Sequence, residues 1–574
     1  MRRMLPLVLA HRRLVLVSIG AALVAQLLLV SAPRVLMAAI DDALVRRTAS
    51  VELFAAALVL IAAARFAANT LHRRCLHATS AHLEHDLRSL VQGSLSRQTF
   101  SWYDGNSTGA LMSRANSDIR AIERFLTFTP AVAVTFVGFG LALVLMMSIH
   151  VGLALAAMAP LPFVFLSGTR MRRVLWPIAW LVQSRTADVT TVVEENLAGA
   201  HVVRGMSAEP AQIDKLQRSA ERLRWIATEE IAVRARYEPV IENVPRLGVA
   251  IVLLYGGMLA IDGQITIGSL VAFAGYVALM QQPFRLLGFI VVMGQRASAS
   301  SSRVLELLDS EPEVTERPHA RRLVAPLGEV AFEDVRFGYA DGPNVLEGFD
   351  LRVRAGETVA LVGRTGCGKS TVARLLPRFY DVRSGRVTID GHDVRDLELR
   401  SLRATVGVVT DEPFLFSASV RDNLAYGRPD ASTEEIAAAA RVADAAEFIE
   451  RLPQGYDTVI GERGYTLSGG QRQRIAIART LLVNPRVLVL DDATSAIDVE
   501  VERRIHAALE QLLEGRTTLL VAHRLSTIAL ADRVVLLDGG RVVAEGTHEQ
   551  LLRTSALYAE VLAHTARPDL EAMT

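Results

Sequence analysis

The sequence predicts two regions of different fold class: an α-helical membrane domain in the first half of the chain and an α/β domain in the second. Long apolar runs recur up to about residue 300, and short Val/Ile/Leu-rich strands alternate with helical stretches beyond about residue 328. The chain is 574 residues long and 51% hydrophobic. It is therefore too long for one domain and more apolar than an ordinary soluble protein.

Six apolar runs in the first region are candidates for transmembrane helices. With their less apolar shoulders, each approaches the ~20 residues that cross a bilayer as a helix. Arginines precede the first run, as in a signal peptide, but no small-residue cleavage site follows and five more runs do, so we expect it to be retained. The six runs are 14–29, 53–64, 131–147, 151–166, 247–261 and 267–280.

The segments between the runs predict the orientation. Stretches 73–125 and 172–240 are long, polar and rich in arginine, whereas the alternate connections are short and carry few positive charges. By the positive-inside tendency, we expect both termini, both long stretches and the α/β domain on the cytoplasmic side of the cytoplasmic membrane. Arg46 and Arg47 are an exception on the outer side.

The long polar stretches also have a helical pattern. Leu83, Leu87, Leu90 and Val91 recur at three- and four-residue spacing, which is typical of one helix face. The simplest interpretation is that transmembrane helices continue far into the cytoplasm as paired rods, which gives the membrane domain long intracellular extensions.

A polar, Pro-containing segment separates the two regions. It runs from about residue 303 to 327 and includes Pro312 and Pro318. We therefore place the membrane domain at 1–305, a linker at 306–327 and the α/β domain at 328–574.

Net charge and cysteine content exclude some classes of protein. The net charge is +1, so no global field points to nucleic acid. Cys75 and Cys367 are the two cysteines, far apart and without a CxxC or His-rich companion. We expect reduced thiols in place of a disulfide framework or a zinc site.

A glycine-rich segment between the strand 358–362 and the helix 371–376 is the strongest local signal, and in this context it is a P-loop. Its glycines let backbone N–H groups curl around phosphate oxygens, and the helix N-terminus favours the negative charge. Lys369 is expected to reach the β- and γ-phosphates of ATP, and Ser370 to ligate Mg²⁺. For Cys367 we favour a tolerated small side chain over a redox role. The predicted nucleotide-binding residues here are Gly363, Arg364, Thr365, Gly366, Cys367, Gly368, Lys369, Ser370 and Thr371.

A second apolar strand, 487–490, ends in Asp491 and Asp492. An acid at the carboxyl end of such a strand is well placed to ligate Mg²⁺ opposite a P-loop. We therefore assign the metal role to Asp491.

Between these two elements the chain carries Leu467, Ser468, Gly469, Gly470 and Gln471, followed by a helix. Here it resembles the ATP-binding cassette (ABC) family, and the resemblance extends over the whole chain. The resemblance implies that this segment is the signature motif, which binds the γ-phosphate of ATP held by the other cassette of a dimer.

The resemblance also implies roles for single residues. Tyr339 matches the aromatic residue that stacks on adenine, Asp498 lies in the D-loop, and His523 matches the switch histidine that contacts the γ-phosphate. Segment 461–464 resembles the X-loop of exporters. Segments 102–118 and 195–204 resemble the two intracellular coupling segments, and membrane helices fused ahead of one cassette imply an exporter and not an importer.

Two residues depart from the family pattern. Asp492 stands where the family has the glutamate that polarises the attacking water, and its carboxylate is one methylene closer to the backbone. A misplacement of about 1 Å can cost on the order of 100-fold in rate. Asp411 stands at the Q-loop glutamine; it can still ligate Mg²⁺, but it adds negative charge and cannot donate as an amide does. The candidate catalytic set is thus Asp492, His523 and Asp411, with weakened hydrolysis.

The signature is intact, so the chain is expected to bring a poor hydrolytic half to one ATP site and a good signature to the other. This is the pattern of one subunit of a heterodimeric exporter. One alternative is a homodimer in which Asp492 still serves as the catalytic base. Another is a nucleotide-gated channel or regulator on the same scaffold. The six runs exclude a soluble cassette ATPase that acts on nucleic acid.

Charged and polar residues within the runs bear on the substrate. Arg65 falls in the second span, and the others lie near the fifth and sixth. The favoured interpretation places them where helices enter the cytosol; the alternative is a basic-lined cavity for an anionic amphiphile, a lipid or a drug. The expected partners are then a second half-transporter, membrane lipids and this amphiphile. The candidate cavity residues are Arg65, Arg246, Gln281, Gln282 and Arg285.

Overall fold

The structure is a computed structural model of the chain. It divides into two compact units, each described below by itself: Met1–Ser96 with Thr108–Ser310, and Arg97–Ser107 with Glu311–Thr574. The second unit therefore takes in a short segment from the first half of the sequence. The residues that the structure describes are 2–280, 282–411, 413–461, 464, 466–491, 513–522 and 524–571.

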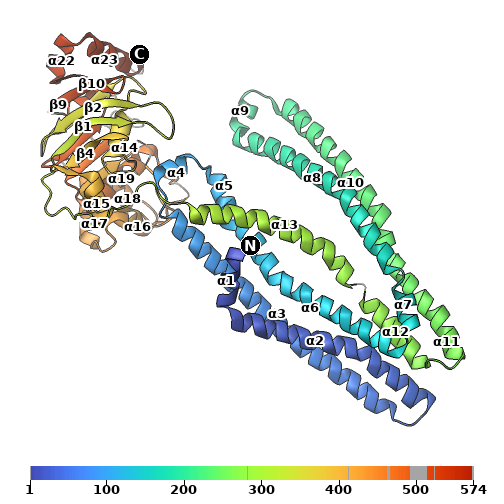
Figure 1. Cartoon of the computed structure of the whole chain (residues 1–574). Coiled ribbons are helices and arrows are strands. Elements are labelled where there is room, and N and C mark those ends of the chain that lie inside the picture. Colours follow the sequence, from blue (N-terminus) through green and yellow to red (C-terminus); the bar gives the residue numbers. More distant parts are fainter. Residues whose placement is uncertain are drawn as a thin grey trace. The chain divides into compact units, whose positions relative to one another are not determined.

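The first unit is built from helices (Figure 1). Three π-helical segments interrupt or extend the longer helices: Ala39–Val45, Arg114–Asp118 and Val252–Gly256. The α-helices are α1 (Leu5–Ala10), α2 (Arg12–Ala38), α3 (Val51–Leu95), α5 (Thr108–Ser113), α6 (Ile119–Ile149), α7 (Val151–Met158), α8 (Leu161–Ala198), α9 (Ala200–Gly205), α10 (Glu209–Ile251), α11 (Gly257–Ile261), α12 (Ile267–Leu279) and α13 (Gln282–Asp309).

The predicted continuation of apolar runs into polar helical rods is confirmed. Helix α3 has 45 residues, so it is about 65–70 Å long, roughly twice the thickness of a bilayer's hydrocarbon core. Along its second half Leu83, Leu87 and Val91 are buried, while Leu90 is exposed. Helices α8 and α10 run side by side in the same way and are joined through α9 (Figure 1).

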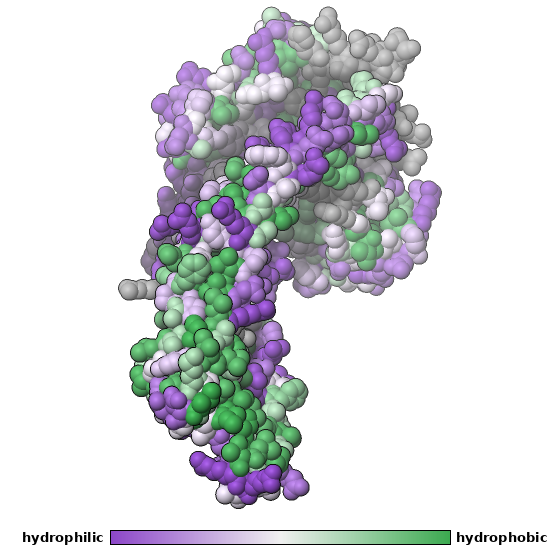
Figure 2. All heavy atoms as spheres, turned by 90° about the vertical axis from the view of Figure 1, so that its right-hand side faces the viewer, coloured by the Kyte–Doolittle hydropathy of each residue, from purple (hydrophilic) through white to green (hydrophobic). Residues whose placement is uncertain are grey.

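Five helical stretches among the described residues are long and apolar enough to cross a membrane. The sixth predicted run forms only the shorter helix α12, so six spans stay a prediction. Little of the apolar surface is covered within the chain: none of the apolar window of α3 is buried. Figure 2 shows apolar side chains over much of the visible surface of the long helices. The five stretches are Arg12–Val45, Val51–Leu95, Thr108–Ile149, Val151–Ala198 and Glu209–Ile261.

Asp41 ties the end of α2 to the start of α12. Its carboxylate accepts hydrogen bonds from the backbone N–H of Gly268 (2.9 Å) and from the hydroxyl of Thr266. A Cβ on Gly268 would lie 2.4 Å from the carbonyl oxygen of Met37, so only glycine permits this approach. The buried carboxylate thus has hydrogen-bond donors at a helix start, where negative charge is favoured.

The second unit contains two sheets, with strand orders β2-β1-β4-β5 and β10-β9-β3-β8-β7-β6 (Figure 1). The first sheet is antiparallel; in the second, β9, β3, β8, β7 and β6 are parallel. All residues of β3 and β8 are buried, as expected for central parallel strands. The strands are β1 (Val330–Phe337), β2 (Leu346–Val353), β3 (Thr358–Gly363), β4 (Ser384–Ile389), β5 (His392–Asp393), β6 (Val406–Val409), β7 (Val487–Asp491), β8 (Thr517–Val521), β9 (Arg533–Asp538) and β10 (Arg541–Gly546).

Most helices of the second unit lie between these strands in sequence, whereas α4 precedes them and α22 and α23 follow them. The longest of those fully described by side chains is α19, which begins at the predicted signature. They are α4 (Phe100–Asp104), α14 (Lys369–Leu375), α15 (Leu399–Thr405), α16 (Val420–Leu424), α17 (Thr433–Val442), α18 (Ala446–Glu450), α19 (Gly469–Val483), α21 (Leu525–Ile528), α22 (His548–Thr554) and α23 (Ala556–Glu571).

Candidate functional site

The candidate site lies at the carboxyl ends of the parallel strands of the second unit. The P-loop follows β3, Asp411 follows β6, and Asp491 ends β7. Because these strands are parallel and belong to one sheet, their carboxyl ends meet at one edge, which we call the phosphate edge. Asp411 is exposed there. The other residues predicted for this edge, Asp492, Asp498 and His523, lie outside the described residues.

The P-loop has the backbone conformation that a phosphate cradle needs. Gly368, just before α14, has φ of +106°, a conformation that residues with a side chain rarely adopt. A Cβ on Gly363 would lie 2.3 Å from the carbonyl oxygen of Leu537, so the loop can leave the end of β3 only at a glycine. The loop then feeds directly into the N-terminus of α14, which favours an anion.

Lys369 places a cation inside this loop. Its side chain is 5% exposed, and Nζ donates hydrogen bonds to the carbonyl oxygens of Gly363 (2.7 Å) and Arg364 (3.0 Å). Nζ also lies 3.8 Å from Sγ of Cys367, whose side chain is buried. The charge is therefore held within the loop, as binding of a polyphosphate requires.

Ser370 and Asp491 bring two oxygen atoms together beside the loop. The Ser370 hydroxyl donates to Oδ1 of Asp491 at 3.1 Å. A hydroxyl and a carboxylate are ligands that Mg²⁺ prefers, and Mg²⁺ is usually held by few protein oxygens together with phosphate oxygens. The pair therefore fits the cation that the sequence predicts.

Two P-loop residues point to other elements. Arg364 forms an ion pair with Glu560 of α23 at 2.7 Å; both side chains are about half exposed, so the pair contributes little to stability. Thr371, by contrast, is buried, and its Oγ1 lies 3.2 Å from the hydroxyl oxygen of Tyr339 in a hydrogen bond. Tyr339 is thereby held beside α14. Thr365 is exposed on the loop.

The predicted signature forms the start of α19. Ser468 is its N-cap: Ser468 Oγ accepts from the backbone N–H of Gln471 (3.3 Å), and Oε1 of Gln471 accepts from the backbone N–H of Ser468 (2.9 Å). This reciprocal capping box fixes the helix start. Leu467 anchors it in the core, while Ser468 stays exposed and Gly469 and Gly470 are half-buried.

Of the five predicted cavity residues, Arg65 and Arg246 are the two whose side chains the structure describes. Arg65 lies on α3 and Arg246 on α10, and both side chains are exposed. Gln281 lies outside the described residues, as do the side chains of Gln282 and Arg285.

A contact that sequence reasoning missed joins α4 to the loop that follows α14. The Phe100 ring packs against Phe379 with centroids 4.3 Å apart and planes tilted by 31°, and the Tyr380 hydroxyl donates to Oδ2 of Asp104 at 2.7 Å. In the sequence, a contact at this place was indicated by two adjacent aromatic residues, Phe379 and Tyr380, shortly after the P-loop helix. Its partner lies 276 residues away in sequence, so nothing local identifies it.

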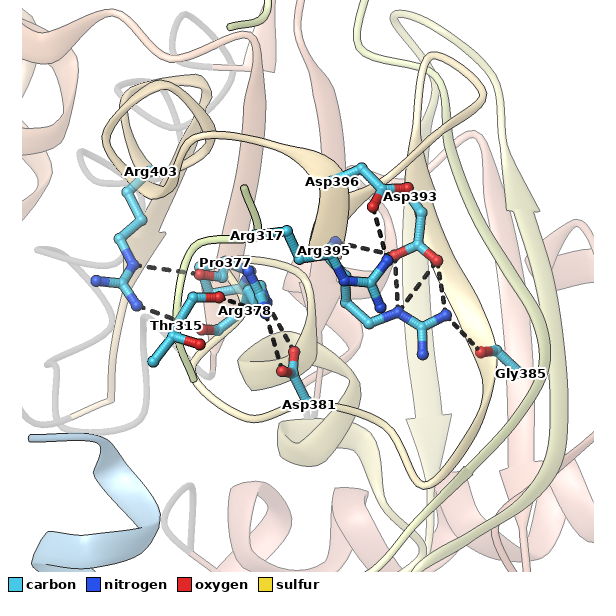
Figure 3. Close-up of polar contacts among 10 residues, drawn as sticks. All are labelled: Thr315, Arg317, Pro377, Arg378, Asp381, Gly385, Asp393, Arg395, Asp396 and Arg403. Carbon is cyan, nitrogen blue, oxygen red and sulfur yellow. Dashed lines mark hydrogen bonds and ion pairs between the residues drawn. The ribbon is translucent and has the colours of Figure 1, made fainter. Parts of the chain in front are cut away.

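Two arginines hold this loop in place (Figure 3). Arg378 is 3% exposed and donates to both carboxylate oxygens of Asp381 (2.7 and 2.9 Å) and to the carbonyl oxygen of Thr315 (3.1 Å). Arg403 donates to the carbonyl oxygens of Pro377 and Arg378. Burial, followed by the charge of Arg378, lowers the pKa of Arg403.

Comparisons with known proteins match both regions of the chain. The family model described as "ABC transporter transmembrane region" matches residues 15–284, and that described as "ABC transporter" matches 346–495. An "ATP-dependent lipid A-core flippase" of Syntrophus aciditrophicus is 36% identical over 568 residues, which are 97% of this chain and 93% of that protein. A "Multidrug efflux ATP-binding/permease protein" of Mycobacterium bovis is 39% identical over 564 residues, 98% of this chain and 47% of that protein.

One solved structure is similar over nearly the whole chain. It is the structure of a bacterial Atm1-family ABC exporter with ATP bound, with 30% sequence identity and a TM-score of 0.79. The similarity covers 97% of this chain and 98% of that one.

Proposed function

The chain belongs to the ABC transporter family, and we propose that it is one subunit of a heterodimeric exporter that moves an amphiphilic substrate across the cytoplasmic membrane. Members of this family of flippases and exporters couple ATP hydrolysis to transport. The proposal includes six membrane spans, a membrane domain at 1–305, a linker at 306–327 and a cassette at 328–574. Both termini and the cassette are cytoplasmic in it.

The residues of the phosphate edge support binding of ATP. In the proposal, Lys369 and the backbone N–H groups of the P-loop hold the β- and γ-phosphates, and Tyr339 stacks on adenine. Ser370 and Asp491 hold Mg²⁺, with Asp411 as a further ligand. When bound, the cation offsets the charge of the phosphate oxygens. The partner's signature covers this ATP, and the signature at Ser468 and Gly469 covers the partner's.

The single observation that carries the heterodimer is the contrast between the two half-sites of this one chain. At the phosphate edge, Asp411 and Asp492 replace an amide and a longer acid, and both changes act on one γ-phosphate. At the other half-site, the signature sequence is intact, its helix start has a complete capping box, and Ser468 is exposed. A homodimer of this chain would contain two weakened sites and no strong one.

The substrate class is supported by the relatives. One is named a lipid A-core flippase and another a multidrug efflux protein, so the two names give a lipid and drugs as cargo. Arginines on apolar helices are costly unless they face a cavity or reach the interface. The favoured interpretation stays that these residues lie where helices enter the cytosol; the alternative that we propose to test is that Arg65, Arg246 and Arg285, with Gln281 and Gln282, contact the polar end of an anionic amphiphile.

The test is purification of the tagged chain from its native membrane, with mass spectrometry of the chains and lipids that accompany it. We expect a second half-transporter with glutamate after its Walker B aspartate, and ATP turnover that requires both chains. The matched control is the tagged chain expressed alone. A stable homodimer with vigorous turnover would overturn the heterodimer and make Asp492 a working base.

A further inference from the structure

The loop that follows α14, residues 376–381, lies between the nucleotide site and α4. Its residue Tyr380 is 7% exposed and touches both. On one side the Tyr380 ring meets the Tyr339 ring, with centroids 5.3 Å apart and planes at 90°. On the other side its hydroxyl donates to Asp104, the last residue of α4. One side chain therefore contacts both the predicted adenine-binding residue and α4.

Three aromatic rings form a cluster on the nucleotide side. Phe337, Tyr339 and Tyr380 meet pairwise at centroid distances of 5.0, 5.3 and 5.7 Å, with planes 61–90° apart. Edge-to-face pairs of this kind favour one relative orientation of the rings. The orientation of Tyr339, and hence the surface that it offers to a base, depends on where Tyr380 lies.

Helix α4 meets the loop at two points. Phe100 and Asp104 are four residues apart, so they share one face of the helix. Phe100 packs against Phe379, and Asp104 accepts a hydrogen bond from Tyr380. Burial, and then the hydrogen bond to Asp104 and its charge, raise the pKa of Tyr380, so the hydroxyl keeps its proton to donate at neutral pH.

The backbone of this loop is fixed by several contacts, which bears on whether a displacement of α4 reaches Tyr380. Arg403 donates to the loop backbone and Arg378 donates to the carboxylate of Asp381 (Figure 3). The Arg403 guanidinium also lies 5.7 Å from the centre of the Phe379 ring. Because these contacts fix the loop backbone, we expect a displacement of α4 to move the side chains of the loop and not its backbone.

We propose that Tyr380 is a positioning residue that couples adenine binding at Tyr339 to the docking of α4 within one chain. The inference rests on the proposed nucleotide site, because Tyr339 must contact adenine. This connection from α4 through Tyr380 to Tyr339 does not involve Asp411, which stands where the family has the Q-loop glutamine. It also ends on a segment that lies in sequence between α3 and α5, two helices of the first unit. Because such coupling is reciprocal, a change in α4 must alter the affinity for ATP.

The first experiment measures the affinity of the full-length transporter, in lipid nanodiscs, for MgATP and for magnesium tripolyphosphate. Asp104→Ala removes the acceptor of Tyr380 and should weaken ATP binding about three- to tenfold. Tripolyphosphate has no base, so its affinity should not change. Asp104→Asn keeps an acceptor oxygen and should stay near wild type.

Ser101 supplies a matched control on the same helix. Its hydroxyl contacts Thr99 and Glu313 and not Tyr380, so Ser101→Ala perturbs α4 without touching the proposed link. We expect its ATP affinity to be unchanged. If Ser101→Ala weakened ATP binding as much as Asp104→Ala does, the effect would come from α4 in general, and the role of Tyr380 would be wrong.

A double-mutant cycle tests the link itself. Tyr380→Phe removes only the hydroxyl, so it should weaken ATP binding as much as Asp104→Ala does, and the two changes together should cost no more than either alone. The inference is overturned if Asp104→Ala stays within twofold of wild type, or if its effect persists in the Tyr380→Phe background. Tyr339→Ala distinguishes failure of the proposed nucleotide site from failure of the role of Tyr380. If Tyr339→Ala does not lower the affinity for ATP, the proposed nucleotide site is wrong.

Discussion

Two helices of the cassette begin at residues assigned to phosphate, and they begin in opposite ways. Among the residues that the structure describes, no side chain caps α14; its N-cap is the left-handed Gly368, and Lys369 folds back onto the loop carbonyls. Helix α19 starts with a complete capping box between Ser468 and Gln471. The N-terminus of α14 is thus set by backbone conformation, and that of α19 by side-chain hydrogen bonds.

The difference agrees with which chain is proposed to hold each phosphate: the same chain at α14, and the partner at α19. At α14 the donors of the first turn are left to a ligand held by the same chain. At α19, Ser468 Oγ already accepts from the N–H of Gln471, so the start keeps its shape while exposed. The hydroxyl still has its own O–H to donate to an anion from outside. A helix N-terminus that keeps its shape without a ligand is suited to contact the phosphate of an ATP molecule that the partner chain holds.

The sharpest test of this comparison uses a second capping box in the same cassette. Ser432 caps α17 as Ser468 caps α19, with Glu435 in place of Gln471. Ser468→Ala and Ser432→Ala should each cost about 1 kcal/mol of stability. Only Ser468→Ala should also lower ATP turnover of the assembled transporter, by about 10²–10³, because it removes a donor to the reacting phosphate. Equal turnover in the two variants, with both melting temperatures measured, would mean that the α19 cap is structural only.

The next largest effect is expected at the start of α14. Lys369→Ala should weaken ATP binding at this chain's own site about 10- to 100-fold, because one or more charge-assisted hydrogen bonds are lost. The sequence holds one other lysine, Lys215, whose ion pair with Glu195 lies on the exposed surface of the first unit. Lys215→Ala is therefore the matched control in a nucleotide-binding titration. Equal affinities in the two variants would remove Lys369 from the site.

Both helix starts were predictable from sequence because they are local. Gly368 is required by one backbone conformation, and Ser468 and Gln471 have the spacing of a capping box. Asp491 was predictable as well, since a parallel sheet gathers the ends of its strands. The contact of Asp104 with Tyr380 was not, because it joins residues 276 positions apart.

The sixth apolar run shows a different limit. Hydropathy marks 267–280 as one span, but α12 ends at Leu279 and α13 starts at Gln282. Pro283 is the second residue of α13 and lacks the N–H that would donate to the carbonyl oxygen of Leu279 in a continuous helix, so it favours a new helix start. Mean hydropathy does not record such a break.

Cysteine labelling gives a smaller effect that tests the start of α14. Cys367 lies in the P-loop, and Cys75 lies buried on α3. At an ATP concentration about ten times the Kd, alkylation of Cys367 should slow about tenfold by mass action. Alkylation of Cys75 should not change, so it is the internal control, and labelled peptides are quantified by mass spectrometry. Equal labelling of Cys367 with and without ATP would place it outside the nucleotide-binding loop.

The smallest effect is expected at Asp492, the acid after the strand end at Asp491. If its carboxylate is too short to polarise water, most of the benefit of a general base is already lost, and Asp492→Ala should lower transport by only about threefold. Asp492→Glu need not raise it, because Asp411 still changes the charge and hydrogen bonding around the phosphate. Changes at Ser468 or Gly469 should cost far more, since they complete the partner's stronger site.

The measurement is ATPase activity and transport by the reconstituted pair, one substitution at a time, with Asp491→Ala as the control that removes a proposed Mg²⁺ ligand. If Asp492→Ala abolished turnover as completely as a change at Gly469, the two half-sites would be equally catalytic. The contrast between α14 and α19 would then describe only how each helix start is built, and Asp492 would act as the base in both sites of a homodimer.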